Sequence, residues 1–258
     1  MEEVDLKPHR SQYWLNPKAK MDDPVRHAAQ EKEICELYAQ AQALREQGVH
    51  VTSADEKTGI QALERAAATL PMKPGQVERR EYEYIRHGTQ CLIASFDVVT
   101  GTVIAPTIGA TRNEEDFVEH IKQAIATAAH ERWVFILDGL NTHFSEGLVR
   151  LVAGLEENSS AVELGVKGKE GILKNVESRR TFLSNHEHRV RFVYTPKHCS
   201  WLNQIEIWFS ILSRRALKRA SFRSVAELKT ALCDFIAYFN RVLAKPFRWT
   251  YTGRPLTA

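Results

Sequence analysis

The segment that most constrains the fold of this chain spans residues 133–137 and reads Trp-Val-Phe-Ile-Leu, without a single polar residue. A strand with one solvated face alternates apolar and polar residues, so this continuous run predicts a strand buried on both faces. Such strands occur in sheets that carry helices on both sides. The segment therefore predicts an α/β fold, and an acidic residue, Asp138, follows it directly.

The other expected elements agree with this fold class. Apolar periodicity predicts helices over residues 24–48, 114–129, 145–153, 200–219 and 224–243, and strands over residues 49–55, 91–98, 102–108 and 191–194. Residues 61–83 are expected to form a loop, and residues 154–188 an insertion with one or two short helices. Strands interleaved with helices predict a mixed five-stranded sheet flanked by helices.

Two aspartates follow predicted strands. Asp55 ends the strand over residues 49–55, and Asp138 follows the central strand. Sites in open α/β sheets gather at strand ends, although each aspartate alone is equally well explained as a cap or turn residue. Glu206 lies on the predicted helix over residues 200–219, in a stripe of short polar side chains with Asn203 and Ser210. These short neighbours leave room for a metal ion and a phosphate.

Three carboxylates of this kind can hold two Mg²⁺ ions about 3.5–4 Å apart for phosphoryl transfer. One ion activates water or a 3′-hydroxyl as the nucleophile, and the other stabilises the leaving oxygen. Because hard cations prefer oxygen ligands, we expect two Mg²⁺ or Mn²⁺ ions as cofactors at Asp55, Asp138 and Glu206.

Positive charge is concentrated in the C-terminal part of the chain. Residues 190–258 contain twelve Lys or Arg and three Asp or Glu, a net charge of +9, whereas the preceding 189 residues carry −6. A basic surface contacts phosphates and steers polyanions, although a solvated helix face explains the charge equally well. The candidate contacts to a polyanion are Lys197, His198, Arg214, Arg215, Lys218 and Arg219.

Cysteine spacing and hydropathy argue against several classes of protein. The four cysteines lie far apart and form no CxxC pair, so we expect free thiols rather than a zinc site or a disulfide framework. No run of 18 apolar residues occurs, so no transmembrane helix is expected. The acidic, polar N-terminus lacks the features of a signal peptide, and we expect a cytoplasmic protein.

Five segments of the chain carry motifs, namely residues 53–61 (SADEKTGIQ), 83–89 (EYIRHGT), 136–143 (ILDGLNTH), 194–209 (YTPKHCSWLNQIEIWF) and 245–251 (KPFRWTY). They resemble motifs of the insertion-sequence transposases of the Tc/mariner superfamily. The third is similar to the family's LDNxxxH motif and the fourth to its TPxxxSWLNxVExWF motif. The fourth is the most specific, since sixteen residues agree in type and order, and the resemblance covers nearly the whole chain from about Asp5 to Ala258.

The resemblance implies a DDE transposase with a ribonuclease-H-like fold and an insertion before the last catalytic helix. Asp55, Asp138 and Glu206 match the family's metal-binding catalytic residues, which implies cutting and joining of DNA at transposon ends. DNA is then the expected partner, bound by a homodimer, in the bacterial cytoplasm at the nucleoid. Glu56 is expected to point to the other face of its strand, and His143 is either a polar loop residue or a group that contacts DNA or orients the carboxylate.

The sequence departs from the family pattern at three points. Gly139 stands where relatives have asparagine, and 67 residues separate Asp138 from Glu206, more than in typical relatives. Full-length relatives begin with helix-turn-helix modules, but only 54 residues precede Asp55, and residues 6–15 look like the end of that region. We therefore expect an N-terminally truncated chain with impaired recognition of transposon ends. Residues 1–47 are expected to hold a remnant of the DNA-binding region and a linker helix, and residues 48–258 the catalytic domain.

Two other interpretations stay open. One is a ribonuclease-H-like nuclease without strand transfer, against which the Ser-Trp-Leu-Asn motif argues. The other is a decayed or domesticated relative that acts only as a DNA-binding protein, against which the intact triad argues.

Overall fold

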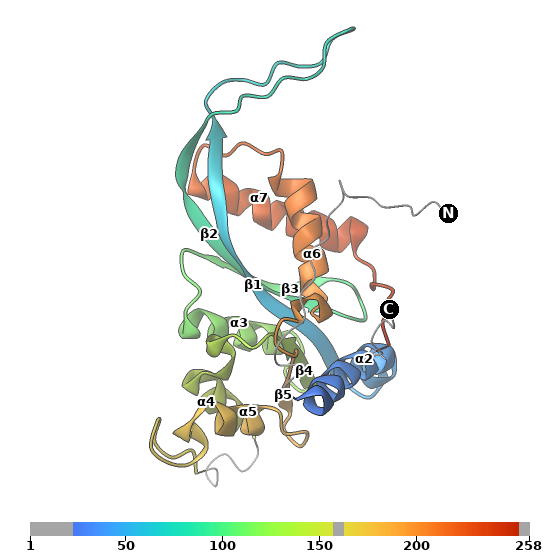
Figure 1. The fold of residues 1–258 in the computed structure, drawn as a ribbon, viewed down its shortest axis with the longest axis vertical. Coiled ribbons are helices and arrows are strands. Elements are labelled where there is room, and N and C mark those ends of the chain that lie inside the picture. The colour runs from blue at the N-terminus through green and yellow to red at the C-terminus, as the bar shows by residue number, and fades with distance from the viewer. Residues whose placement is uncertain (1–22, 157–162, 253–258) are drawn as a thin grey trace, which may run out of the picture.

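A five-stranded sheet lies at the centre of the structure, a computed structural model that describes residues 23–156 and 163–252. In spatial order the strands are β3 (Val103–Gly109), β2 (Tyr84–Asp97), β1 (Val49–Arg65), β4 (Arg132–Leu137) and β5 (Val190–Tyr194) (Figure 1). The pairs β3–β2 and β2–β1 are antiparallel, whereas the pairs β1–β4 and β4–β5 are parallel. The sheet is therefore mixed, as the sequence predicted.

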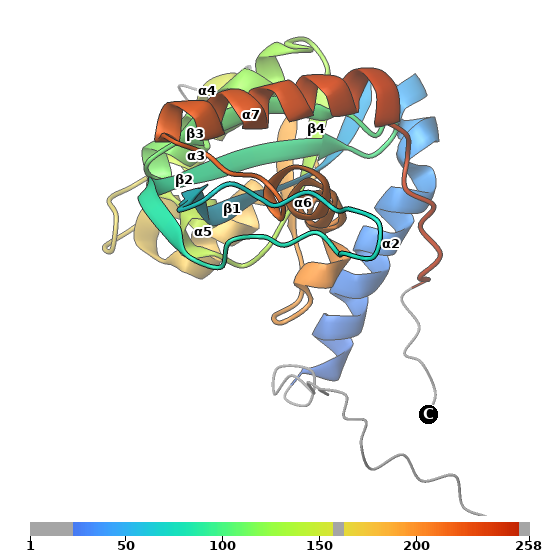
Figure 2. The same ribbon diagram turned by 90° about the horizontal axis from the view of Figure 1, so that it is seen from above.

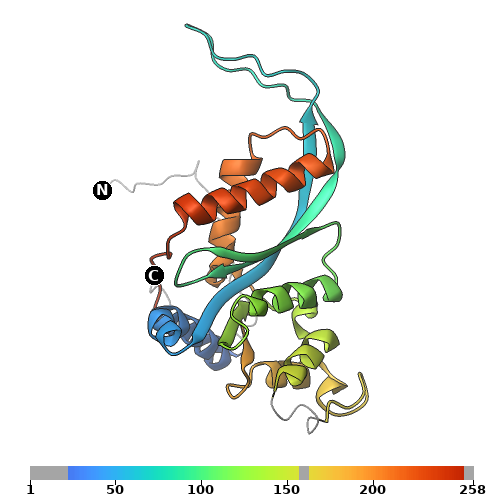
Figure 3. The ribbon, with the colours of Figure 1, turned by 180° about the vertical axis from the view of Figure 1, so that it is seen from behind.

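Helices pack around both faces of this sheet (Figures 2 and 3). They are α2 (Pro24–Glu46), α3 (Glu114–Ala126), α4 (Glu146–Leu155), α5 (Val176–Leu183), α6 (Ile205–Leu212) and α7 (Val225–Tyr238). Helices α3, α4 and α5 share one hydrophobic cluster with β4 and β5, and α2 shares another with the opposite face of the same strands. Helices α6 and α7 cover β2 and the outer part of β1. No helix in the described part of the chain is long and apolar enough to cross a membrane.

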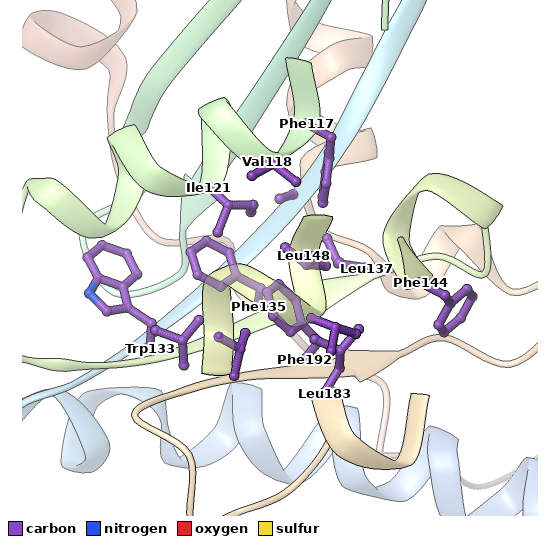
Figure 4. Close-up of a cluster of buried hydrophobic side chains, with 14 of the residues drawn as sticks. Phe117, Val118, Ile121, Trp133, Phe135, Leu137, Phe144, Leu148, Leu183 and Phe192 are labelled. Carbon is purple, nitrogen blue, oxygen red and sulfur yellow. The ribbon is translucent and has the colours of Figure 1, made fainter. Parts of the chain in front are cut away.

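The central strand β4 is buried on both faces, as its composition predicted. Trp133, Phe135 and Leu137 point toward α3, α4 and α5, where Figure 4 shows their side chains among those of the helices. Val134 and Ile136 point toward α2. Each of these five residues is at most 4% exposed. A polar side chain at any of these positions would lose its hydrogen bonds to water.

The first two strands are longer than the sequence predicted. β1 continues to Arg65 instead of ending at Asp55, and β2 begins at Tyr84. The loop expected over residues 61–83 is wrong at its start, because β1 and β2 stay paired up to Arg65 and Tyr84 and their backbone hydrogen bonds override a composition typical of loops. Residues 66–83 form an arm that projects from the end of the sheet (Figure 1).

The helix expected over residues 200–219 is interrupted twice. A 3₁₀ turn (Ser200–Leu202) precedes α6, and a π-helical turn (Ser213–Leu217) follows it. Asn203 stands at the first interruption, where its side-chain amide donates a hydrogen bond to the carbonyl of Ala54 (Nδ2–O distance 2.9 Å). The expectation of one continuous helix is wrong because this contact holds the chain in an extended conformation before α6.

Tyr38 joins α2 to the sheet and to the segment before α6. Its buried hydroxyl donates to the carbonyl of Leu202 (2.8 Å) and lies 2.9 Å from Oγ of Ser53. The same oxygen accepts a hydrogen bond from the backbone N–H of Gln204 (3.3 Å). One side chain of α2 therefore connects β1 with the approach to α6.

Helix α2 shares a hydrophobic core with the sheet rather than standing apart from it. The domain boundary expected at residue 47 stays a prediction. Residues 6–15, expected to be the end of a DNA-binding region, lie outside the described residues. No disulfide joins the four cysteines, all of which belong to the described part of the chain.

Removal of the Tyr38 hydroxyl tests the junction between α2, β1 and α6. We expect Tyr38→Phe to lower the free energy of unfolding by about 1–3 kcal/mol, because its buried partners lose a hydrogen bond. Tyr238→Phe is the matched control, since Tyr238 is 44% exposed and its replacement leaves stability unchanged. Chemical denaturation measures both variants, and equal stabilities would contradict a structural role for the Tyr38 hydroxyl.

Candidate metal centre

The parallel pairing of β1 with β4 brings two of the predicted catalytic residues to the same edge of the sheet. Ser53 lies opposite Ile136, and Asp55 and Asp138 are each two residues further along these neighbouring strands. Side chains two residues apart point to the same face of a sheet. Asp55 is buried, and Asp138 is half-buried in the wall of an open groove of about 800 Å³.

The carboxylates of Asp55 and Asp138 lie close enough to repel each other. One oxygen of each, together with a ring nitrogen of His143, lies within 4.8 Å of the others. Burial, and then the charge of Asp138, raises the pKa of Asp55 to about 8. Burial acts in the same direction on Asp138, but the hydrogen bond and charge of His143 outweigh it, so the pKa of Asp138 is lowered. The pair therefore keeps a proton at neutral pH, and a bound cation would displace it.

His143 forms a buried link between Asp138 and Glu56. Its Nδ1 lies 2.9 Å from Oδ1 of Asp138, and its Nε2 lies 3.3 Å from Oε2 of Glu56. The side chains of His143 and Glu56 are at most 1% exposed. Burial opposes the charged form of the imidazole, but the two carboxylates outweigh burial and raise the pKa of His143 to about 10. The imidazole is thus positively charged and holds the Asp138 carboxylate in place.

The sequence assigned no role to Glu56 and left the role of His143 open. Because side chains alternate along a strand, Glu56 points to the face opposite Asp55. There it contacts His143, which belongs to the 3₁₀ turn Asn141–Phe144 after β4. The imidazole also packs on the ring of Phe117, with 4.4 Å between ring centroids. Of the alternatives for His143, the geometry favours orientation of the carboxylate. The sequence signal for this link is a glutamate directly after the first aspartate and a histidine shortly after the second.

The third predicted carboxylate, Glu206, lies outside the cluster of ligand atoms around the two aspartates. It is exposed in the first turn of α6, three residues after Asn203. Asn203 binds the carbonyl of Ala54, the residue before Asp55. The start of α6 is therefore fixed against β1 at the residue before Asp55, and the Glu206 side chain is exposed.

A second group of potential metal ligands lies under α2. Ligand atoms of His27, Glu31 and Cys199 lie within 4.8 Å of one another. However, the two nitrogens of His27 face different partners, since Nε2 is 3.5 Å from Sγ of Cys199 and Nδ1 is 3.5 Å from Oε1 of Glu31. This arrangement ties the segment after β5 to α2.

The predicted DNA contacts fall in two places. Lys197 and His198 line the groove that contains Asp138. The other four are exposed on or directly after the π-helical turn that follows α6: Arg214, Arg215, Lys218 and Arg219. The structure therefore brings two of the six beside Asp138 and places the other four at the turn after α6.

The two aspartates fit a divalent cation. Their oxygens are the hard ligands that Mg²⁺ and Mn²⁺ prefer, and a cation between them relieves the repulsion that raises the pKa of Asp55. His143 does not offer a free ligand atom, because both of its nitrogens face carboxylates. Among the predicted ligands, the residues that the structure brings together to hold the ion are therefore Asp55 and Asp138.

Comparison with known proteins relates this arrangement to one family. Residues 50–229 match the family described as DDE superfamily endonuclease. The Mos1 strand transfer complex is similar at 15% identity and a TM-score of 0.51, over 92% of this chain and 59% of that one. The Mos1 mariner paired end complex with Mn matches at 16% identity and a TM-score of 0.49, over 92% and 60% of the two chains. The catalytic domain of Mos1 mariner transposase matches at 13% identity and a TM-score of 0.47, over 88% and 85%.

This chain thus spans about three-fifths of the length of the proteins in the first two Mos1 complexes. Among curated proteins, none matches the sequence. The likeness to the strand transfer complex confirms the predicted ribonuclease-H-like fold of the mixed sheet. The family match covers more than half of the chain and includes Asp55, Asp138 and Glu206. The chain therefore belongs to the DDE superfamily endonucleases.

Proposed function

We propose that this chain is the catalytic domain of a DNA transposase that cuts and joins DNA at transposon ends. Asp55, Asp138 and Glu206 hold two divalent cations, Mg²⁺ or Mn²⁺, for phosphodiester hydrolysis and strand transfer. The observation that carries this proposal is the approach of the two aspartate carboxylates within 4.8 Å at the edge of a buried sheet. Membership of the DDE superfamily endonucleases supports it.

The residues around the aspartates have distinct roles in this proposal. When bound, the cations activate the attacking hydroxyl and stabilise the leaving oxygen. Asp55 and Asp138 bind the cations and set their position. His143 is a positioning residue that holds the Asp138 carboxylate through a contact of 2.9 Å, and Glu56 holds His143 from the other side.

The start of α6 determines where the third carboxylate enters the site. Tyr38 and Asn203 fix this start against β1 through hydrogen bonds of 2.8 Å to the Leu202 carbonyl and 2.9 Å to the Ala54 carbonyl. Glu206 lies in the first turn that follows. Its reach toward the aspartates therefore depends on these two hydrogen bonds.

The proposed partner is DNA, with Lys197 and His198 beside Asp138 as contacts to the phosphate backbone. The similar Mos1 structures are a paired end complex and a strand transfer complex. Strand transfer joins two ends to one target, so we also propose a homodimer on DNA. A location at the bacterial nucleoid remains part of the proposal.

Removal of one aspartate should abolish cleavage and joining together. We expect Asp138→Ala to lower the rate of Mg²⁺-dependent nicking of a supercoiled plasmid by at least about 10³-fold, as when a member of a concerted catalytic group is lost. Joining of an oligonucleotide with a free 3′-hydroxyl falls equally. Asp234→Ala, exposed on α7, is the control and keeps both activities. A wild-type chain that binds the plasmid but cleaves nothing in Mg²⁺ or Mn²⁺ would favour a relative that only binds DNA.

Loss of the imidazole should weaken metal binding. We expect His143→Ala to raise the Mn²⁺ dissociation constant by about 10–100-fold, as for other residues that orient metal ligands. The reason is that Asp138 loses its support and Glu56 is left buried without a partner. His143→Gln, whose amide can donate to Asp138, recovers part of the affinity.

Electron paramagnetic resonance titration with Mn²⁺ measures this affinity without DNA. His87→Ala is the matched control, because it removes another histidine–glutamate pair, with Glu64, far along β1 and β2. The positioning role is wrong if His143→Ala binds Mn²⁺ as tightly as His87→Ala does.

The raised pKa of Asp55 predicts how stability depends on pH. Folded Asp55 keeps its proton up to pH about 8, whereas the unfolded carboxyl loses it near pH 3.9. Between pH 5 and 6.5 the folded state thus binds one more proton, and the free energy of unfolding of the metal-free chain falls by up to about 1.4 kcal/mol per pH unit as the pH rises.

Asp55→Asn removes this contribution, so its stability depends less on pH over the same window. Mg²⁺ displaces the proton, and we expect it to raise the wild-type melting temperature more at pH 8 than at pH 6. Denaturation at several pH values, with and without Mg²⁺, measures both effects. Identical pH profiles for wild type and Asp55→Asn would contradict the raised pKa.

A further inference from the structure

Two hollows flank the π-helical turn Ser213–Leu217 that follows α6. One, of about 530 Å³, lies between this turn and β1, and the other, of about 620 Å³, lies between the turn and the segment after α7. Arg214 lines both hollows, so we treat them as one basic groove. Its charged residues are Lys57, Arg65, Arg214, Arg215, Lys218 and Lys245.

The basic groove is distinguished by the absence of acidic residues from its lining. Three other hollows in the described chain all include at least one carboxylate. The groove at Asp138 also contains Asp23 and Glu177, and the hollow between α3 and α4 contains four glutamates. A third hollow, under the C-terminal segment, includes Glu36. A surface whose charged side chains are all cations has a positive potential that attracts polyanions.

Five of the six cations of the basic groove are not neutralised by a carboxylate of the described chain. Among the described residues, none of Lys57, Arg214 or Lys218 has a carboxylate within ion-pair distance. Arg215 and Lys245 are likewise exposed and without such a partner in the described chain. Internal neutralisation therefore does not explain why these charges lie together.

The π-helical turn itself spaces the basic side chains. The N–H of Lys218 bonds to the carbonyl of Ser213 (2.8 Å), five residues earlier, so the turn holds one residue more than an α-helical turn. The hydroxyl of Ser213 bonds back to the carbonyl of Phe209 (2.7 Å) and stabilises this irregularity. Arg214 and Lys218 line the hollow at β1, while Arg215 faces the second hollow.

The basic groove begins beside the proposed metal centre. Lys57 is two residues after Asp55 on β1, and residues two apart point to the same face of a strand. At the other side of the groove, Arg214 lies on the continuation of the helix that carries Glu206. A polyanion in this groove therefore runs along the same face of the sheet as the carboxylates.

We propose that the basic groove binds the phosphate backbone of duplex DNA and guides it toward the aspartates. This inference rests on the proposed function, since DNA is the polyanion that such a site acts on. It adds Lys57, Arg65 and Lys245 to the expected contacts, and it gives Arg214, Arg215 and Lys218 a common surface.

Salt dependence of DNA binding tests the groove without any cleavage. The probe is a fluorescent duplex of random sequence, titrated with the full chain in EDTA between about 50 mM and about 200 mM NaCl. Each phosphate contact contributes about 0.9 to the slope of log K against log[salt]. We expect the double variant Arg214→Ala/Lys218→Ala to lower this slope by about 1.8 and to weaken binding by roughly an order of magnitude or more.

Two control variants show whether the effect depends on the positive charges of the basic groove or only on the net charge of the protein. Lys122→Ala/Arg150→Ala removes the same charge from the hollow between α3 and α4 and keeps the wild-type slope. Arg214→Lys/Lys218→Arg keeps both charges and also keeps the slope. Circular dichroism checks that every variant folds.

The outcomes distinguish this inference from the proposed function. The groove hypothesis is wrong if Arg214→Ala/Lys218→Ala leaves the slope unchanged or if Lys122→Ala/Arg150→Ala lowers it equally. It is also wrong if the wild type does not bind the duplex. Plasmid nicking in Mg²⁺ decides the proposed function independently. If the double variant reduces the slope but the wild type does not nick the plasmid, DNA binding by the basic groove is supported and the proposed transposase function is wrong.

Discussion

The parallel register between β1 and β4 is the constraint on which the rest of the site depends. It sets Asp55 and Asp138 level on adjacent strands, where two carboxylates face each other partly shielded from water. The protein places one buried imidazolium, His143, against Asp138, with Glu56 behind it. One positive charge among three carboxylates leaves an excess of negative charge, and burial makes that excess costly. The metal-free fold reduces it by keeping a proton on Asp55, which is why a divalent cation is the natural ligand of this edge.

Local sequence was sufficient to predict part of this arrangement. The apolar run over residues 133–137 required a central strand, and Asp138 at its end required a solvated or liganded position. The link from Glu56 to His143 could not be predicted in the same way. It depends on how the turn after β4 folds back against α3, where the imidazole meets Phe117, and periodicity carries no information about such a turn. The extension of β1 also escaped prediction, because it depends on pairing with β2 and on packing under α6 and α7, both of which bring together residues far apart in the sequence.

The role of Tyr38 also could not be predicted from the sequence. Helical spacing places it on the apolar face of its helix, but the decisive group is its hydroxyl, which reaches β1 and the segment before α6 at once. A single buried hydroxyl contributes little net energy, yet leaving its partners unsatisfied is costly, so it constrains geometry more than it adds stability. The two aspartates are consequently preorganised by the sheet, whereas Glu206 is positioned through a chain of side-chain contacts and remains exposed. In the proposed mechanism the third ligand is the adjustable one.

Opposite charges lie side by side along one face of the sheet, since Asp55 and Lys57 are two residues apart on β1. Without a cation, the aspartates repel the phosphate that the basic groove attracts, so a DNA strand held in the groove is kept from the reactive position. A divalent cation held by Asp55 and Asp138 would neutralise that edge and remove the repulsion. Interactions among the buried groups are screened less by salt than those of the exposed lysines and arginines. In the proposed mechanism, metal occupancy would control whether bound DNA reacts and ionic strength would control whether DNA is bound, through separate residues.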